Sequence, residues 1–227
     1  MQEWRREAGF ELRRFTNESP QLIVDLPVFK IDKLPVTNAR YRACIAAGVC
    51  GQVDEVSVDL PSDYNDNPRY DDYPVRGVFW DDAVAYYGWV GKRLPTEAEW
   101  EKAARGTDGR LFPWGDEWDP RGATDILRPH AVGSQAINVS PYGAYDMLGN
   151  AVEWVADWYA PDYYAHSPFR NPTGPAREEE RVRRSRGGGP DLQGTPRFGL
   201  PSRSGDSPDH SFGGFRCVYV PGDGAGQ

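Results

Sequence analysis

The cysteines of this chain are its first candidates for metal or redox chemistry, and there are only three, Cys44, Cys50 and Cys217. Cys44 and Cys50 stand six residues apart, so a bridge between them is possible only across a helix end. The odd count favours reduced thiols, and the start of the sequence has no apolar leader stretch. We therefore expect a cytoplasmic protein.

The C-terminal part holds the residues best suited to binding a partner. Apolar side chains stand there in a stretch that Gly and Pro interrupt too often for a buried helix, and polar side chains alternate with them. Such a mixture is the composition of protein-binding hot spots. We expect a ligand-binding site made of Leu192, Gln193, Arg197, Phe198, Leu200, Arg203, Asp206, His210 and Phe212. The alternative is that half of these residues fill the core.

Residues 96–106 have the signals of a helix that packs on the core. Thr96 followed by Glu99 fits a capping box at the helix start, and Gly106 supplies the stop. The spacing predicts one apolar face made of Trp100, Ala103 and Ala104.

Two further helices are expected. One follows Thr37, buries Tyr41, Cys44 and Ile45 and ends before Gly48. The other covers residues 81–89, with Asp81 or Asp82 as its cap and Val84, Tyr87 and Gly88 facing inward.

Composition limits the class of protein. A chain of 227 residues is most simply one domain, 1–227, and it is possible that it is the C-terminal part of a longer protein. Its 25 Gly and 20 Pro indicate an irregular, loop-rich α+β fold. The net charge of −8 argues against general nucleic-acid binding, and no apolar run is long enough for a membrane span.

Four sequence blocks, in order, carry a resemblance to a known family. They are RLPTEAEWEKAARG at 93–106, FPWG at 112–115, YGAYDMLGNAVEW at 142–154 and GFRC at 214–217. The chain resembles the formylglycine-generating enzyme, or sulfatase-modifying factor, family. This resemblance implies a C-type lectin-like fold, with two or three helices around a small antiparallel sheet.

The catalytic residues of that family are not matched. Formylglycine-generating enzymes hold copper through two cysteines before the final GFRC block, because thiolates are the soft ligands that Cu(I) prefers. Residues 181–215 contain no cysteine here. The related iron-dependent sulfoxide synthases need a histidine-rich site, whereas His130, His166 and His210 are isolated. We therefore expect a chain that is not an enzyme, the alternatives being a sulfatase-modifying oxidoreductase or a sensor domain derived from one.

The family commonly binds calcium in the turn equivalent to residues 146–153. The resemblance implies a structural Ca²⁺ held by the side chains of Asp146 and Glu153 and by the carbonyls of Gly149 and Ala151. Oxygen ligands of this kind suit Ca²⁺. The alternative is a tight turn that enters a strand, with Glu153 exposed.

The departure from the family between Arg181 and Phe212 resembles the variable proteins of diversity-generating retroelements. These use the same lectin-like fold and rewrite a C-terminal region at adenine-templated codons. The resemblance implies a candidate variable region, 181–218, on a rigid scaffold, because loop residues braced by a core tolerate change. The expected partner is an unknown macromolecule, most simply a protein.

Overall fold

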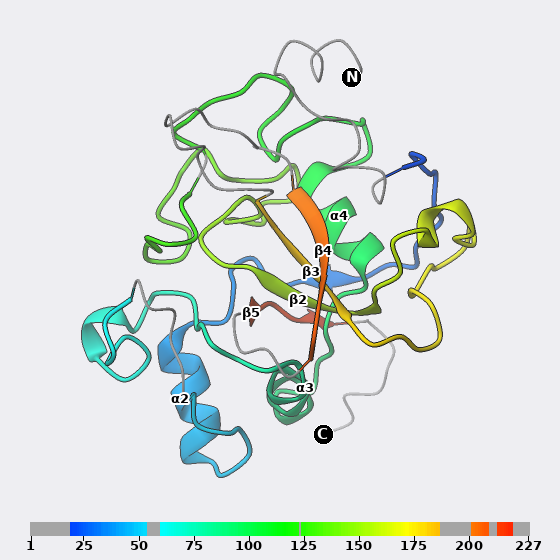
Figure 1. Cartoon of the computed structure of the whole chain (residues 1–227). Coiled ribbons are helices and arrows are strands. Elements are labelled where there is room, and N and C mark those ends of the chain that lie inside the picture. Colours follow the sequence, from blue (N-terminus) through cyan, green and yellow to red (C-terminus); the bar gives the residue numbers. More distant parts are fainter. Residues whose placement is uncertain (1–18, 54–59, 123, 187–200, 209–212, 220–227) are drawn as a thin grey trace.

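A computed structural model describes residues 19–53, 60–122, 124–186, 201–208 and 213–219 (Figure 1). Three α-helices are present in these ranges: α2 (Asn38–Ala46), α3 (Trp80–Trp89) and α4 (Glu97–Arg105). Short 3-10 helices are η2 (Pro68–Tyr70) and η3 (Tyr163–Ala165). The rest of the described chain is mostly turns and loops, as its glycine and proline content predicts. The α+β class is therefore confirmed.

The strands form two small sheets. The larger has the order β4-β3-β2-β5, and comprises β4 (Pro201–Asp206), β3 (Arg181–Arg186), β2 (Glu153–Trp158) and β5 (Gly214–Phe215). The second pairs β1 (Lys30–Ile31) with β6 (Val218–Tyr219). Most pairs are antiparallel, but β2 and β5 run parallel, so the sheet is mixed.

Helix α4 follows its sequence signals closely. The Thr96 hydroxyl accepts a hydrogen bond from the backbone N–H of Glu99, and the Glu99 carboxylate accepts one from the backbone N–H of Thr96. The predicted apolar face is buried, with Trp100 packing against Val155 of β2 and Val182 of β3. Truncating a buried tryptophan of this kind to alanine typically lowers the free energy of unfolding by about 3–5 kcal/mol.

Helix α3 presents a different face from the predicted one. Ala83 and Tyr86 are buried, whereas the predicted Val84 and Tyr87 are only half-buried. Tyr86 packs on Phe215, with ring centroids 5.2 Å apart, and this contact sets the rotation of the helix. The cap is Phe79, which makes no side-chain cap bond, so the predicted aspartate cap is wrong.

The prediction that the cysteines are reduced is wrong for Cys44 and Cys50. Cys44 and Cys50 form a disulfide, with Cα atoms 5.4 Å apart. Gly48 has a φ of 72°, and this left-handed residue turns the chain back after α2 so that the two thiols meet. Cys217 is a buried free thiol.

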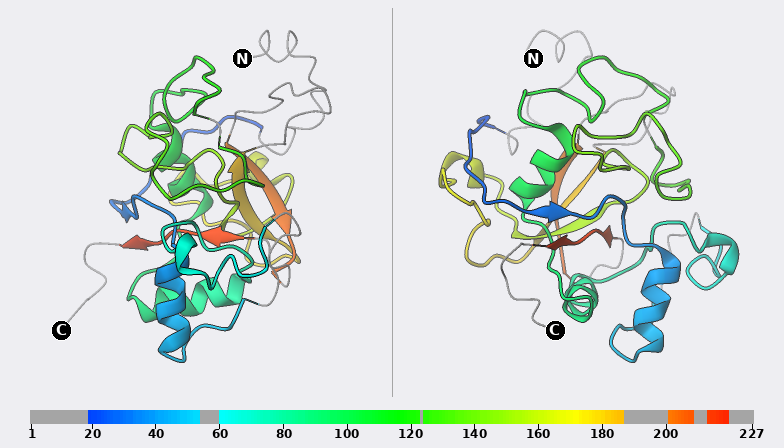
Figure 2. Two further views of the ribbon diagram at one scale, coloured as in Figure 1. Left: turned by 90° about the vertical axis from the view of Figure 1, so that its left-hand side faces the viewer. Right: turned by 180° about the vertical axis from the view of Figure 1, so that it is seen from behind.

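The larger sheet has two different faces (Figure 2). Val155 and Val182 lie in the apolar cluster of α4, whereas Trp154 lies in the cluster of α2 and α3 with Tyr41 and Phe215. Because side chains alternate along a strand, neighbouring residues of β2 and β3 serve opposite sides of the sheet.

Candidate functional site

The β3–β4 hairpin positions the predicted ligand-binding region. Its strands pair in regular antiparallel register from Arg181 with Asp206 to Arg186 with Pro201. The start of the 181–218 region is anchored by Val182, and its end by Phe215 and Cys217, all with 0 % exposure. The region is therefore held by the core at both of its ends.

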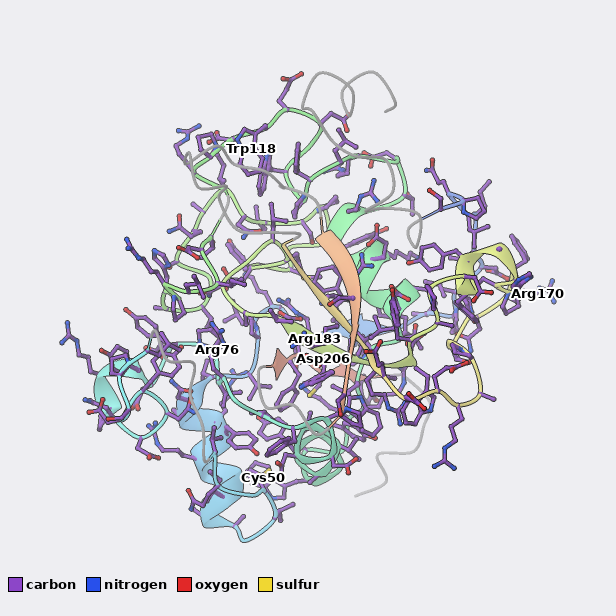
Figure 3. All side chains as sticks on the ribbon, in the orientation of Figure 1. Cys50, Arg76, Trp118, Arg170, Arg183 and Asp206 are labelled. Carbon is purple, nitrogen blue, oxygen red and sulfur yellow. A yellow bond between two sulfur atoms is a disulfide. The ribbon has the colours of Figure 1, made fainter. Side chains whose placement is uncertain are left out.

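Arg183 and Asp206 lie together on the face of the sheet that carries Trp154 (Figure 3). They form an ion pair, and the Arg183 guanidinium lies 5.4 Å from the centre of the Trp154 ring. Burial lowers the pKa of Arg183, and the negative charge of Asp206 offsets part of that decrease. Asp206, a predicted ligand residue, is thus engaged within the protein.

Arg181 is held between two indole rings. Its guanidinium lies 3.6 Å from the ring centre of Trp80 and 3.4 Å from that of Trp158, and it donates to the carbonyl of Ala156 at 2.8 Å. Burial lowers the pKa of Arg181 to about 10. The stacking fixes the start of β3 to β2 and α3, so the hairpin has a rigid base.

The structure places only part of the predicted ligand-binding set. Arg203 and Asp206 belong to β4. The other predicted residues lie outside the described residues: Leu192, Gln193, Arg197, Phe198, Leu200, His210 and Phe212. Whether these side chains share one face stays a prediction.

The predicted calcium turn is built from unusual backbone. Asp146 and Asn150 have φ values of 59° and 63°, and Gly149 has a φ of 91°. A Cβ at Gly149 would lie 1.9 Å from the carbonyl oxygen of Thr124, so only glycine fits there. The backbone of this turn is therefore held in one conformation, which fixes the directions of its carbonyl groups.

Asp146 retains capacity for a cation. Its Oδ2 accepts from the N–H of Gly133 at 2.7 Å, while Oδ1 is buried without a hydrogen-bond partner. Burial raises the pKa of this carboxyl group. A buried carboxylate oxygen without a donor is costly, and an ion would relieve that cost.

Glu153 does not fit the predicted role as it is arranged here. Arg216 donates to both of its oxygens, at 2.8 Å each, and Trp100 Nε1 donates to Oε2 at 2.8 Å. Burial would lower the pKa of Arg216, but the Glu153 carboxylate raises it above its ordinary value. The predicted alternative of an exposed Glu153 is also wrong, since it is 1 % exposed. Calcium binding itself stays a prediction, with Asp146 as the one carboxylate available.

Sequence reasoning missed the arginine partners of the acidic residues. Glu153 was assigned to calcium, although the arginine of the GFRC block is its partner 63 residues away. Arg184, read only as part of an altered family block, is buried and paired with Glu97. A signal for these pairs was present in the sequence. A glutamate within an apolar segment needs a cationic partner once it is buried, so Glu153 and Glu97 could have been matched to arginines.

Comparison with known proteins identifies the class. Residues 5–220 match the sulfatase-modifying factor enzyme 1-like domain, and the chain belongs to this family. It is 41 % identical over 262 residues to a formylglycine-generating enzyme of Streptomyces coelicolor, which covers 88 % of this chain and 81 % of that protein. It spans 44 % of the Bos taurus enzyme and 59 % of the Thermomonospora curvata enzyme.

Two solved structures share the fold. PvdO from Pseudomonas aeruginosa aligns with a TM-score of 0.71 and 25 % identity, over 92 % of this chain and 87 % of that one. Treponema denticola variable protein 1 aligns with a TM-score of 0.63 and 22 % identity, over 87 % of this chain and 86 % of that one. The C-type lectin-like fold of this family is therefore confirmed, as is the resemblance to a variable protein.

The expectation that the chain is not an enzyme is corrected by its relatives. Besides the Streptomyces coelicolor protein, it is 37 % identical over 170 residues to a hercynine oxygenase of Mycolicibacterium thermoresistibile, which covers 62 % of this chain and 38 % of that protein. Both relatives are named as enzymes. The absence of a cysteine pair therefore does not place this chain outside a catalytic family.

Proposed function

We propose that this chain is a ligand-binding protein of the sulfatase-modifying factor family. The proposed recognition surface is the middle of the 181–218 region, and the proposed ligand is a protein. The observation that carries the proposal is the anchoring of this region, with Val182 and Phe215 in the core and Arg181 stacked between two indoles. A rigid base allows surface residues to change at little cost in stability.

The gene itself offers a direct test. If the region varies as in retroelement variable proteins, the neighbouring DNA holds a near-copy of the 3′ end that differs only at adenines, beside a reverse transcriptase gene. A complete locus without such a copy would overturn the variable-protein assignment.

A catalytic function is the second candidate, and the named relatives favour it. The copper chemistry of cysteine pairs does not fit the residues, because Cys44 and Cys50 form a disulfide and Cys217 is buried. A catalytic role would use other side chains. Mass spectrometry of a cysteine-containing sulfatase peptide, after incubation with the protein, copper and oxygen, tests the formylglycine reaction itself: formylglycine in the product would favour the enzyme, and an unmodified peptide would count against that reaction.

The compartment also stays a proposal. Among the described residues, no helix is long and apolar enough to cross a membrane. The disulfide between Cys44 and Cys50 removes the argument from reduced thiols for the expected cytoplasmic location, because such bonds persist mainly in oxidising compartments. Cell fractionation with an antibody tests that location, and recovery outside the cytoplasm would refute it.

A further inference from the structure

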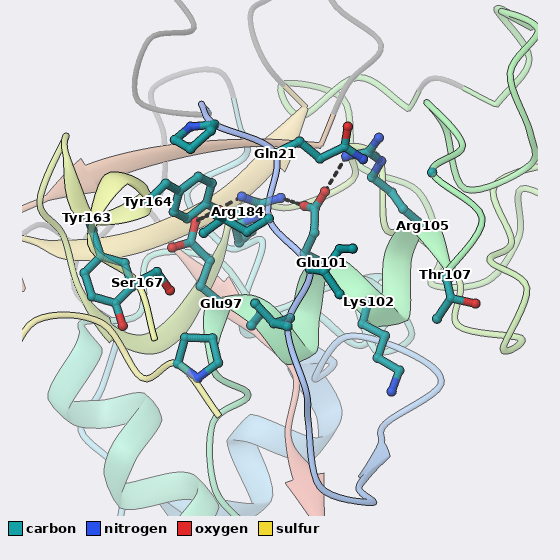
Figure 4. Close-up of a pocket in the computed structure, with 18 of the residues that line it drawn as sticks. Gln21, Glu97, Glu101, Lys102, Arg105, Thr107, Tyr163, Tyr164, Ser167 and Arg184 are labelled. Carbon is teal, nitrogen blue, oxygen red and sulfur yellow. Dashed lines mark hydrogen bonds and ion pairs between the residues drawn. The ribbon is translucent and has the colours of Figure 1, made fainter. Parts of the chain in front are cut away.

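A cavity of about 390 Å³ lies beside α4, and residues 20–24 form one of its walls (Figure 4). We call this segment the strap, because it runs across the helix and belongs to no helix or strand itself. The opposite wall comes from α4, from η3 and from Arg184 of β3. One side of a cavity of small-molecule size is therefore formed by a single length of chain.

The strap is held by few polar contacts. Within the part of the chain that the structure describes, none of residues 20–24 forms a hydrogen bond. The first hydrogen bonds after the strap are those of Asp25, whose N–H donates to the carbonyl of Phe169 at 2.7 Å and whose carbonyl accepts from the N–H of Asn171 at 2.8 Å. The polar anchor that follows the strap is therefore at Asp25.

The strap is also poorly buried. Ile23 is 86 % exposed and Leu22 is 39 % exposed, and Pro20 and Gln21 are exposed as well. Within the strap, Val24 alone is half-buried. A segment with few buried apolar contacts and no hydrogen-bonded backbone opens locally at a small cost in free energy.

The opposite wall is held far more firmly. Helix α4 begins with the capping box of Thr96 and Glu99, and Glu97 pairs with Arg184 at 3.1 Å between Oε1 and Nη1. The side chains of Glu97 and Arg184 are only 4 % and 2 % exposed. Because this wall is fixed and the strap is weakly held, motion at the cavity is expected in the strap.

We propose that the strap is a gate, which moves away from α4 about a hinge at Asp25 and opens the cavity to solutes. The two backbone hydrogen bonds of Asp25 and the pairing of β1 with β6 hold the chain beyond the hinge in place. Opening breaks no hydrogen bond of residues 20–24, and Val24 is the strap side chain that it brings into water. Such a gate controls access to the cavity without a change in α4 or in the sheet.

Labelling of a thiol in the cavity tests the gate. Ala98 of α4 lines the cavity and is half-buried, so Ala98→Cys places a thiol on the firm wall. Ala165→Cys is the reference, because Ala165 is exposed and does not line the cavity. The parent chain gives the background, since its free cysteine, Cys217, is buried. With a bulky dye-labelled maleimide, we expect Ala98→Cys to react completely but about tenfold more slowly than Ala165→Cys, because it reacts only while the strap is open.

Variants of the strap identify it as the gate. Val24→Ser should raise the labelling rate of Ala98→Cys about fivefold, because it removes apolar contact that keeps the strap closed. Ile23→Ser is the matched control, since this neighbouring β-branched side chain is 86 % exposed, and it should leave the rate unchanged. Melting curves verify that each variant is folded. Equal rates in Val24→Ser and Ile23→Ser, labelling of Ala98→Cys as fast as that of Ala165→Cys, or no labelling of Ala98→Cys would each overturn the proposal.

The size of the reagent separates opening of the strap from a wider entrance. If Val24→Ser acts by opening the strap, it should accelerate N-ethylmaleimide and the bulky maleimide by the same factor. An acceleration confined to N-ethylmaleimide would show that the smaller side chain only widens the entrance, and it would overturn the proposal.

Discussion

The Arg216 guanidinium donates two hydrogen bonds of 2.8 Å to the Glu153 carboxylate. Both side chains are almost inaccessible to water, at 0 % and 1 % exposure. The pair joins the turn after β5 to the start of β2. It lies where sequence reasoning placed a metal ion, so a guanidinium supplies the positive charge that Glu153 requires in the interior.

Breaking this pair is expected to destabilise the fold. Arg216→Met or Glu153→Gln should each lower the free energy of unfolding by about 3–5 kcal/mol, because the remaining partner is left buried and uncompensated. The double variant should lose much less than the sum of the two. Urea unfolding measures all three, and strictly additive losses would contradict the coupling. Arg121→Met, at the exposed pair with Asp119, is the control and should leave the midpoint unchanged.

Arg181→Lys tests the stacked base of the hairpin. A lysine cannot stack its planar group between Trp80 and Trp158, so we expect a loss of about 1–2 kcal/mol. Arg170→Lys is the matched control, since Arg170 is exposed and 3.7 Å from Asp25. Thermal melting of both variants measures the difference, and equal melting temperatures would show that the stacking contributes nothing.

Alkaline pH should weaken the protein partly through Cys217. Burial raises the pKa of this thiol from 9.0 to about 12. The unfolded chain then releases the proton above pH 9 while the folded chain keeps it, so stability is full below pH 9 and falls up to about pH 12. Urea unfolding at pH 8 and pH 10 should show a smaller decrease for Cys217→Ala than for the parent chain. Identical decreases would contradict the assignment.

Calcium binding is expected to be weak. Asp146 is the one predicted carboxylate with an oxygen left for an ion, and few charged ligands place affinity at about 10⁻⁴–10⁻³ M. Millimolar calcium should therefore raise the melting temperature relative to a chelator, and Asp146→Asn should remove the increase. The prediction fails if the parent chain melts at the same temperature in both.

The C-terminal surface is tested by changing six residues at once. Serine at Leu192, Arg197, Phe198, Leu200, Arg203 and Phe212 should change partner choice with little effect on melting, because exposed substitutions typically shift stability by less than about 0.5 kcal/mol in either direction and partly offset one another. Phe215→Ala, in the core, is the control and should cost about 3–5 kcal/mol. A loss in the six-residue variant as large as that of the control would mean that the segment is core.

Local signals predicted the fold better than the site. Thr96, Glu99 and Gly106 act on neighbouring backbone, so α4 was predictable from sequence alone. The rotation of α3 was not, because it depends on the contact of Tyr86 with Phe215, a residue distant in sequence. The same holds for Glu153, whose partner Arg216 stands 63 residues away. The spacing of residues along one sequence does not reveal such distant pairs, so the calcium role that the family resemblance implied for Glu153 had nothing to oppose it.

Strand β3 divides its arginines between two environments, and this has a consequence for insertions and deletions. Arg183 packs over Trp154, and Arg184 over Trp100 on the opposite face. A shift of β3 by one residue would exchange these two faces, remove Arg184 from Glu97 and bury the wrong side chains. A single residue added between Trp158 and Arg181 must therefore be absorbed before the strand begins. The distance along the chain from β2 to β3 is thus constrained by the alternation of Arg183 and Arg184.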